Sequence, residues 1–288
     1  MAVDLHLHTT HSDGSFAPKD LVDLVRHYNV DVMAVTDHDD ISGVQEAQAR
    51  GKEVGVRVIA GIELSIDYPL QGRAHLHLLG LMLDIENPDL LARLHYLREA
   101  RRARAKEIIE RLQKMNIDVH YDELEQIVSG ESIGRPHIAH LLVKKGVVTQ
   151  VSEAFEKYLG RNAPAFVAKK KMTLAEAIDL VHKAKGLAIL AHPISLFAKN
   201  FDELARYLDH FRELGLDGLE AYYSYHPAEL TRFLLDYAKK NRMAVSGGSD
   251  FHGEAKPDIQ PAIGTGNLHI PPEIVPALIE FRKEKYGE

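Results

Sequence analysis

Histidines and acidic residues occur along this sequence in short motifs that could bind metal ions. His6-Leu7-His8 stands in a short apolar run, and because alternate side chains of a strand point to the same face, both imidazoles can reach one point. Asp13 follows in a turn-forming segment that could fold its carboxylate back over the strand end. Similar groups recur along the chain, at Asp37-His38-Asp39, Glu63, His75-Leu76-His77, His192 and Asp250-Phe251-His252.

The elements that must position these groups follow a regular alternation. Short, mostly apolar runs are typical of strands buried on both faces, and they occupy residues 3–7, 32–36, 56–62, 74–81, 187–191, 218–222 and 243–246. Helical patterns lie between them, at residues 18–28, 42–53, 203–214 and 228–240, and a capping box at Thr173 and Glu176 begins another helix. The alternation predicts parallel β/α units that close into a barrel.

Nearly every predicted strand delivers a histidine or an acidic residue at its carboxyl end. These ends meet at one face of a parallel barrel, where active sites are built from several strands at once. A single such residue is more simply explained as a capping carboxylate or a core histidine. Their recurrence at so many strand ends predicts one shared metal site.

The composition restricts the metal, the partners and the compartment. The chain has no cysteine, so a transition metal would be bound by nitrogen and oxygen atoms, which suits Mn²⁺, Fe²⁺ or Zn²⁺. The formal net charge of −7 argues against extended binding of duplex nucleic acid. A small anionic substrate would need only a local positive site, which metal ions supply. A signal-peptide pattern and a membrane-spanning apolar run are both lacking, which predicts a cytoplasmic protein; the oligomeric state stays open.

The alternation of strands and helices breaks once, between about residues 84 and 170, where the patterns are helical. We therefore expect a barrel made of residues 1–98 and 166–288, interrupted by a helical insertion at residues 99–165 that could act as a lid.

The motifs H-x-H, S-D-G-S, T-D-H-D, G-x-E, A-H-P and G-S-D-F-H, in this order, resemble those of the PHP (polymerase and histidinol phosphatase) superfamily. The resemblance implies an α/β fold, a distorted (β/α)7 barrel similar to a TIM barrel, and a trinuclear metal centre, with Mn²⁺ as the favoured ion. It also implies the metal ligands, which are His6, His8, Glu63 and Asp250 for one ion, Glu63, His77 and His192 for a second, and Asp13, His38 and His252 for a third. His75 shares a strand face with His77, and the family's H-x-L-G register favours His77.

Clustered divalent metals activate water and hold phosphoryl oxygens, so no serine or cysteine nucleophile is needed. We expect a phosphoesterase in which a metal-bridged hydroxide attacks phosphorus, with Asp13, Glu63, His192 and Asp250 as catalytic residues. A site histidine or water would protonate the leaving alcohol. Asp37 and Asp39 are expected to orient His38, whereas Glu220 and His226 could belong either to the site or to the core.

The predicted insertion contains Gly134-Arg135-Pro136-His137, which resembles the branch of the family that acts on nucleoside 3′,5′-bisphosphates and on 5′ ends of short oligoribonucleotides. We expect Arg135 and His137 to bind a substrate phosphate, with Pro136 holding Arg135 extended before a helix. Arg135 could instead pair with Glu131. Alternative functions are a histidinol-phosphate phosphatase or other small phosphomonoesterase, a related amidohydrolase, and a non-catalytic metal-binding regulatory module, although the complete ligand set argues against the last.

Overall fold

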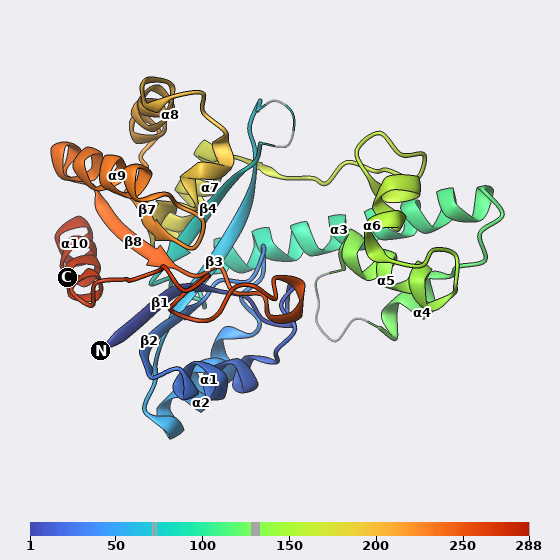
Figure 1. Cartoon of the computed structure of the whole chain (residues 1–288), viewed down its shortest axis with the longest axis horizontal. Helices are drawn as coiled ribbons and strands as arrows, with labels where there is room; N and C mark the ends of the chain where they lie inside the picture. The colour runs from blue at the N-terminus through green and yellow to red at the C-terminus, as the bar shows by residue number, and fades with distance from the viewer. Residues whose placement is uncertain (71, 73, 128–132, 288) are drawn as a thin grey trace. The chain divides into compact units, whose positions relative to one another are not determined.

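A computed structural model describes residues 1–70, 72, 74–127 and 133–287. The chain divides into two compact units, one made of Met1–Leu91 and Met172–Glu288, and the other of Ala92–Lys171. We call them the barrel unit and the helical unit. Every strand that the structure describes lies in the barrel unit (Figure 1). The expected insertion, residues 99–165, lies within the helical unit, whose first boundary falls inside one long helix, α3 (Pro88–Lys114).

The barrel unit is built on one sheet with the strand order β1-β2-β3-β4-β6-β7-β8. These strands are β1 (Ala2–Leu7), β2 (Val30–Val35), β3 (Arg57–Asp67), β4 (Leu76–Leu81), β6 (Leu187–Leu190), β7 (Gly218–Tyr223) and β8 (Ala244–Gly248). The two-residue β5 (Met172–Thr173) pairs with β3 outside this order. Leu7 forms a parallel bridge with Phe251, just beyond β8, so the sheet is nearly closed. This confirms the predicted distorted barrel and each of its strands.

Strand β4 differs from the prediction of parallel units, because it runs antiparallel to both β3 and β6. Too few residues separate Asp67 from Leu76 for the crossover helix that parallel neighbours require. The reversal places His77 at the start of β4, opposite Ser65 of β3. The start of an antiparallel strand lies at the same sheet edge as the carboxyl ends of its neighbours, so His77 still reaches the expected face.

Helices surround the sheet of the barrel unit (Figure 1). They are α1 (Pro18–His27), α2 (Val44–Val54), α7 (Leu174–Lys183), α8 (Phe201–Glu213), α9 (Ala228–Asn241) and α10 (Ile274–Tyr286), with short 3₁₀ turns η2 (Pro193–Leu196) and η3 (Gly253–Ala255). The predicted capping box begins α7, since the Thr173 N–H donates to Glu176 Oε2 over 2.8 Å. No described helix has the length and apolarity needed to cross a bilayer.

Apolar residues from most strands form the core that fixes the strand positions. Val3 and Leu5 of β1 pack with Ile189 of β6 and with Leu278 of α10. Because side chains alternate along β1, the burial of Leu5 turns His6 to the opposite face. The core therefore sets the direction of the polar side chains.

The helical unit has an apolar core of its own, which includes Ile108, Leu112, Ile138, Leu142 and Leu159. Its elements are the part of α3 from Ala92 on, α4 (Tyr121–Glu125), α5 (Arg135–Lys144), α6 (Val151–Ala154) and a short π-helix, η1 (Phe155–Leu159). A unit whose helices pack against one another is expected to have a core of its own.

Candidate metal centre

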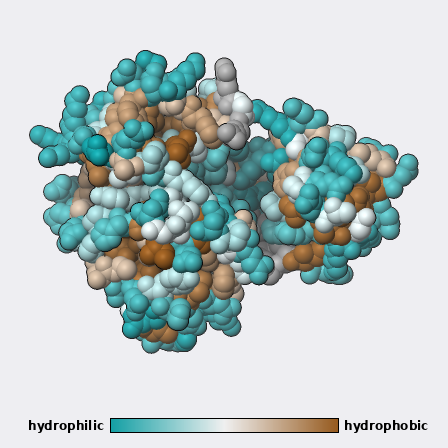
Figure 2. All heavy atoms as spheres, viewed as in Figure 1, coloured by the Kyte–Doolittle hydropathy of each residue, from teal (hydrophilic) through white to brown (hydrophobic). Residues whose placement is uncertain are grey.

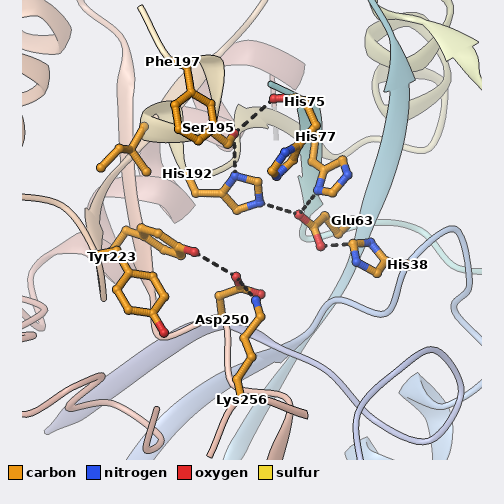
Figure 3. A pocket seen from close by; sticks show the side chains of 12 residues that line it. His38, Glu63, His75, His77, His192, Ser195, Phe197, Tyr223, Asp250 and Lys256 are labelled. Carbon is orange, nitrogen blue, oxygen red and sulfur yellow. Dashed lines mark hydrogen bonds and ion pairs between the residues drawn. The ribbon is translucent and has the colours of Figure 1, made fainter. Parts of the chain in front are cut away.

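Every residue that the sequence predicted as a metal ligand lies in the barrel unit, and the side chains converge on one region. They form overlapping groups in which ligand atoms lie within 4.8 Å of one another. The groups are His6, His8, Glu63 and Asp250; His8, Asp13, His38 and His252; His38, Glu63 and His77; and His75, His77 and His192. Side chains from strands far apart in sequence thus meet at one edge of the sheet (Figure 3).

Glu63 is the centre of this cluster and is almost fully buried, with 1% of its side chain exposed. Its Oε1 lies 2.8 Å from His77 Nδ1 and 2.9 Å from His192 Nε2 (Figure 3). Its Oε2 lies 3.0, 3.2 and 3.3 Å from nitrogens of His38, His8 and His6. Burial alone would raise the pKa of Glu63, but the surrounding histidines outweigh burial and hold this pKa well below its usual value.

The nitrogens that His6 and His8 direct at Asp250 are suited to a cation. His6 Nε2 and His8 Nε2 lie 3.5 and 3.4 Å from Asp250 Oδ1. Both nitrogens and Glu63 Oε2 are buried, and none forms a hydrogen bond with any described residue. Buried polar atoms are normally hydrogen-bonded, so convergent lone pairs without donors fit a divalent metal bound by nitrogen and oxygen.

Glu220 of β7 orients the His6 imidazole and binds the backbone of His192. His6 Nδ1 donates to Glu220 Oε1 over 2.9 Å, which leaves the lone pair on His6 Nε2 facing the cluster. Glu220 Oε2 accepts a hydrogen bond of 2.6 Å from the His192 backbone N–H. The sequence had left Glu220 open between a site role and a core role, and the contacts make it a support of the site.

Asp13, His38 and His252 form the third predicted set. Asp13 Oδ1 lies 3.2 Å from His252 Nε2, and Asp13 Oδ2 lies 3.9 Å from His38 Nε2. The other ring nitrogen of His252, Nδ1, donates to the Asp250 carbonyl over 2.8 Å, which turns Nε2 toward Asp13. The predicted turn thus brings the Asp13 carboxylate over the strand ends.

The backbone at the strand ends is strained where it places ligands. His192 and Asp250 adopt φ values of 26° and 59°, a region that costs a residue other than glycine about 1–3 kcal/mol. Gly248 allows β8 to approach β1, because a Cβ at this position would lie 2.2 Å from the Cβ of His6. Such strain persists where the surrounding structure holds a functional geometry.

The two carboxylates that flank His38 have contacts elsewhere. Asp37 Oδ1 accepts from the Thr9 N–H over 2.8 Å and from Ser12 Oγ over 2.5 Å, and Ser12 Oγ lies 3.3 Å from His8 Nδ1. Asp37 therefore supports the His8 side of the cluster. Asp39 Oδ1 accepts from the Ser65 N–H over 2.8 Å. Their expected role in orienting His38 stays a prediction.

A cavity of about 470 Å³ opens onto the cluster, and its wall adds residues that the sequence motifs did not single out. Lys256 Nζ lies 2.5 Å from Asp250 Oδ2, and the Tyr223 hydroxyl donates to the same oxygen over 3.0 Å (Figure 3). Lys256 belongs to no recognisable motif, so only the fold could reveal it.

His75 and His77 both line this cavity, and the preference for His77 as the metal ligand rests on the family's H-x-L-G register.

Arg135 and His137 belong to the helical unit. Arg135 is the first residue of α5, which corrects the expectation of an extended residue before the helix; a proline is tolerated in the first helical turn because no N–H bond is lost there. Its Nη1 donates to the Leu159 carbonyl over 2.9 Å, and its guanidinium lies over Phe155 and Phe166. His137 Nδ1 accepts from the Gly134 N–H over 3.0 Å. The alternative partner, Glu131, lies outside the described residues.

Comparisons with known proteins agree with the fold and the motif order. The family model of the PHP domain matches residues 4–183. The chain is 36% identical over 249 residues to a 5′-3′ exoribonuclease of Haemophilus influenzae, covering 86% of this chain and 89% of that protein. It is 31% identical over 261 residues to a 3′,5′-nucleoside bisphosphate phosphatase of Chromobacterium violaceum, covering 89% of this chain and 90% of that protein.

A solved structure from Bifidobacterium adolescentis, described as that of a metal-dependent phosphoesterase, matches with a TM-score of 0.80 and 30% identity. The match covers 97% of this chain and 96% of that one, so it includes both units. With the family model matching well over half of the sequence, the chain belongs to the family of PHP-domain proteins.

Proposed function

We propose that this protein is a metal-dependent phosphoesterase that hydrolyses phosphate esters of small nucleotides. Its first expected substrate is a nucleoside 3′,5′-bisphosphate, and its second is a 5′-phosphorylated short oligoribonucleotide. The observation that carries this proposal is the convergence of buried imidazole nitrogens and carboxylate oxygens that lack hydrogen-bond donors. The names of the relatives support the choice of phosphoesters and nucleotides.

The proposed metal centre is trinuclear, with Mn²⁺ favoured and Fe²⁺ or Zn²⁺ as alternatives. Glu63 would bridge two ions, because each of its carboxylate oxygens faces a different set of histidines. The remaining ligands would be His6, His8, Asp13, His38, His77, His192, Asp250 and His252. When bound, such ions lower the pKa of water and neutralise phosphoryl oxygens.

The residues around the ligands hold the site in its working geometry. Glu220 orients His6, and Ser195 Oγ, 2.9 Å from His192 Nδ1, orients His192. The Lys256 ammonium, on the cavity wall beside Asp250, is placed to neutralise a substrate phosphate oxygen. Several of these ligands, among them His6, Glu63 and Asp250, are buried, which strengthens the electrostatic interactions around them.

We also propose that Arg135, with His137, binds the second phosphate of a bisphosphate. The aromatic faces of Phe155 and Phe166 orient the planar guanidinium, and such a group binds phosphate through paired hydrogen bonds. The action of the helical unit as a lid and the cytoplasmic location both stay predictions of the sequence.

A substrate panel with Mn²⁺ tests the proposal. It compares a nucleoside 3′,5′-bisphosphate, a nucleoside 5′-monophosphate, histidinol phosphate and a 5′-phosphorylated short RNA. We expect the highest kcat/KM for the bisphosphate or the RNA. Much faster turnover of histidinol phosphate would overturn the nucleotide assignment and favour the histidinol-phosphatase alternative. Stoichiometric metal binding without turnover of any phosphoester would favour the regulatory module.

A further inference from the structure

A second hollow adjoins the catalytic cavity in the barrel unit. It has a volume of about 590 Å³, within the range of about 300–1,000 Å³ that small-ligand sites occupy. Ile194 and Phe197 line both hollows, so the two hollows share a wall along the segment that follows β6. We call it the Phe197 groove; its other lining residues are Pro193, Ala198, Lys199, Asn200, Phe201, Leu204, Pro227, Glu229 and Leu230.

The floor and walls of the Phe197 groove are apolar and partly aromatic. Leu204 of α8 and Leu230 of α9 are buried beneath it, whereas Phe197 and Phe201 are 52% and 39% exposed. One face of the Phe201 ring stacks on Phe233, with ring centroids 4.6 Å apart, so its opposite face is the one available to a ligand. Figure 2 shows apolar residues gathered beside α8 on this unit. Exposed aromatic faces of this kind are the platforms on which nucleobases stack, at about 1–3 kcal/mol per base.

The chain maintains Phe197 in an unfavourable backbone conformation. Its φ of 50° lies in the left-handed region, which is costly for a bulky residue. The preceding turn is anchored by Ser195, whose Oγ donates to the His75 carbonyl over 3.1 Å and contacts His192 Nδ1. Phe197 therefore lines both the catalytic cavity and the groove, and the turn before it contacts His192, a predicted metal ligand.

The charges at the rim indicate the direction of a bound chain. Lys199, just before α8, and Glu229, at the start of α9, both line the groove and are exposed. A nucleotide phosphate would be attracted to Lys199 and repelled from Glu229. An apolar floor with the Lys199 ammonium at its rim suits a base attached to one phosphate better than a charged peptide.

We infer that the Phe197 groove binds the second nucleobase of a 5′-phosphorylated single-stranded oligoribonucleotide, whose first phosphate lies at the metal cluster. Phe197 separates the first and second nucleotides, and Lys199 faces the phosphate that links the second to the third. This inference rests on the proposed function and adds a binding site for the second nucleotide of its oligonucleotide substrate.

The test compares a nucleoside 3′,5′-bisphosphate, a 5′-phosphorylated trinucleotide, and the same trinucleotide with an abasic second position. The variants are Phe201→Ala and Lys199→Ala, whose residues line the groove and not the catalytic cavity, with Phe197→Ala as a third. Ile263→Ala, at an exposed apolar residue outside both hollows, is the matched control. Thermal melting checks the folding of each variant, and anisotropy of a 3′-labelled trinucleotide measures binding independently of turnover.

For Phe201→Ala, the ratio of kcat/KM for the trinucleotide to that for the bisphosphate should fall about tenfold, the value of one stacked base. The abasic trinucleotide should show the same deficit with the wild-type protein and no further loss with the variant. Equal losses on trinucleotide and bisphosphate, or equal binding of intact and abasic trinucleotides by the wild-type protein, would overturn the inference while leaving the phosphoesterase intact. Failure of the wild-type protein to hydrolyse any of the three substrates would overturn the proposed function itself.

Discussion

The two units of this protein bury different kinds of side chain. All the buried polar and charged residues of the described chain, among them His6, Glu63 and Asp250, belong to the barrel unit. In the helical unit the buried side chains of the described residues are apolar, such as Leu112 and Leu142. Burial of polar groups without full hydrogen bonding opposes folding, so the barrel unit must gain its stability from its strand core. The difference assigns the metal chemistry to one unit.

The helical unit carries clustered arginines, whereas the barrel unit carries the candidate metal ligands. Arg104 Nε donates to the Val167 carbonyl over 2.8 Å, and Arg135 donates to the Leu159 carbonyl. Burial, together with the nearby Arg135 and Arg101, lowers the pKa of Arg104 to about 10. Like charges held close together suit an anion, so this unit is expected to affect substrate affinity more than chemistry.

The largest effect should come from the central carboxylate of the barrel unit. Glu63→Gln keeps the size of the side chain but removes the charge that faces the histidines, so kcat should fall on the order of 10³-fold or more. Metal content, measured by elemental analysis, should fall with it. Glu280→Gln, at an exposed position of α10, is the matched control. Full activity in Glu63→Gln would remove Glu63 from the site.

A smaller effect is expected from Glu220, which contacts the His6 imidazole and the His192 backbone N–H. Glu220→Gln should reduce metal affinity or kcat by about 10–100-fold, because the His6 ring loses its charged partner. Metal titrations followed by activity assays measure this change. Wild-type metal affinity and wild-type kcat together would show that the contact serves folding alone.

Arg135→Ala tests the helical unit and should act mainly on KM. Loss of a charged hydrogen bond of about 1.5–3 kcal/mol should raise KM for a nucleoside 3′,5′-bisphosphate about tenfold or more. A simple phosphodiester, which lacks the second phosphate, should be affected much less. Arg161→Ala, at an exposed arginine of the same unit, is the control. Equal losses on both substrates would indicate a folding defect or a role at the metals, and wild-type kinetics would exclude this residue from substrate binding.

The smallest effect concerns the stability of the barrel unit near neutral pH. Burial lowers the pKa of His226 to about 4, so the folded state keeps the ring neutral while the unfolded chain takes up a proton below about pH 6.5. Stability should therefore decrease as pH falls, by less than about 1 kcal/mol between pH 7 and 6. His226→Gln should reduce this decrease in urea unfolding, and His140→Gln, at an exposed histidine of the helical unit, should not. An identical pH dependence in wild type and His226→Gln would contradict this assignment.

The sequence predicted the elements of the barrel unit better than their directions. The strand carrying Leu5 and the capping box at Thr173 were evident, because hydrophobic pattern and capping are local properties. The antiparallel direction of β4 was not, since alternation of strands and helices favours parallel pairing by default. Local patterns also cannot show contacts such as that between His6 and Glu220, which lie 214 residues apart.

The residues of the candidate site that belong to motifs could be predicted from the sequence, whereas those outside the motifs could not. His6, Glu63 and His252 could be named because the strand period and the motif order brought them to one edge. Lys256 could not, because its approach to Asp250 depends on the path of the chain through η3. The start of α5 at Arg135 was likewise not predictable, because a proline usually disfavours the helical conformation of the residue before it. Pro136 is tolerated in the first helical turn, and Arg135 is helical.

The number of metal ions bound per chain tests the central claim most directly. Protein saturated with Mn²⁺ and freed of excess metal by gel filtration should contain more than one ion per chain, about three if every proposed ligand is used. Elemental analysis and activity should be measured on the same sample, because both should fall together on chelation. At most one ion per chain with full phosphoesterase activity would contradict the multinuclear centre.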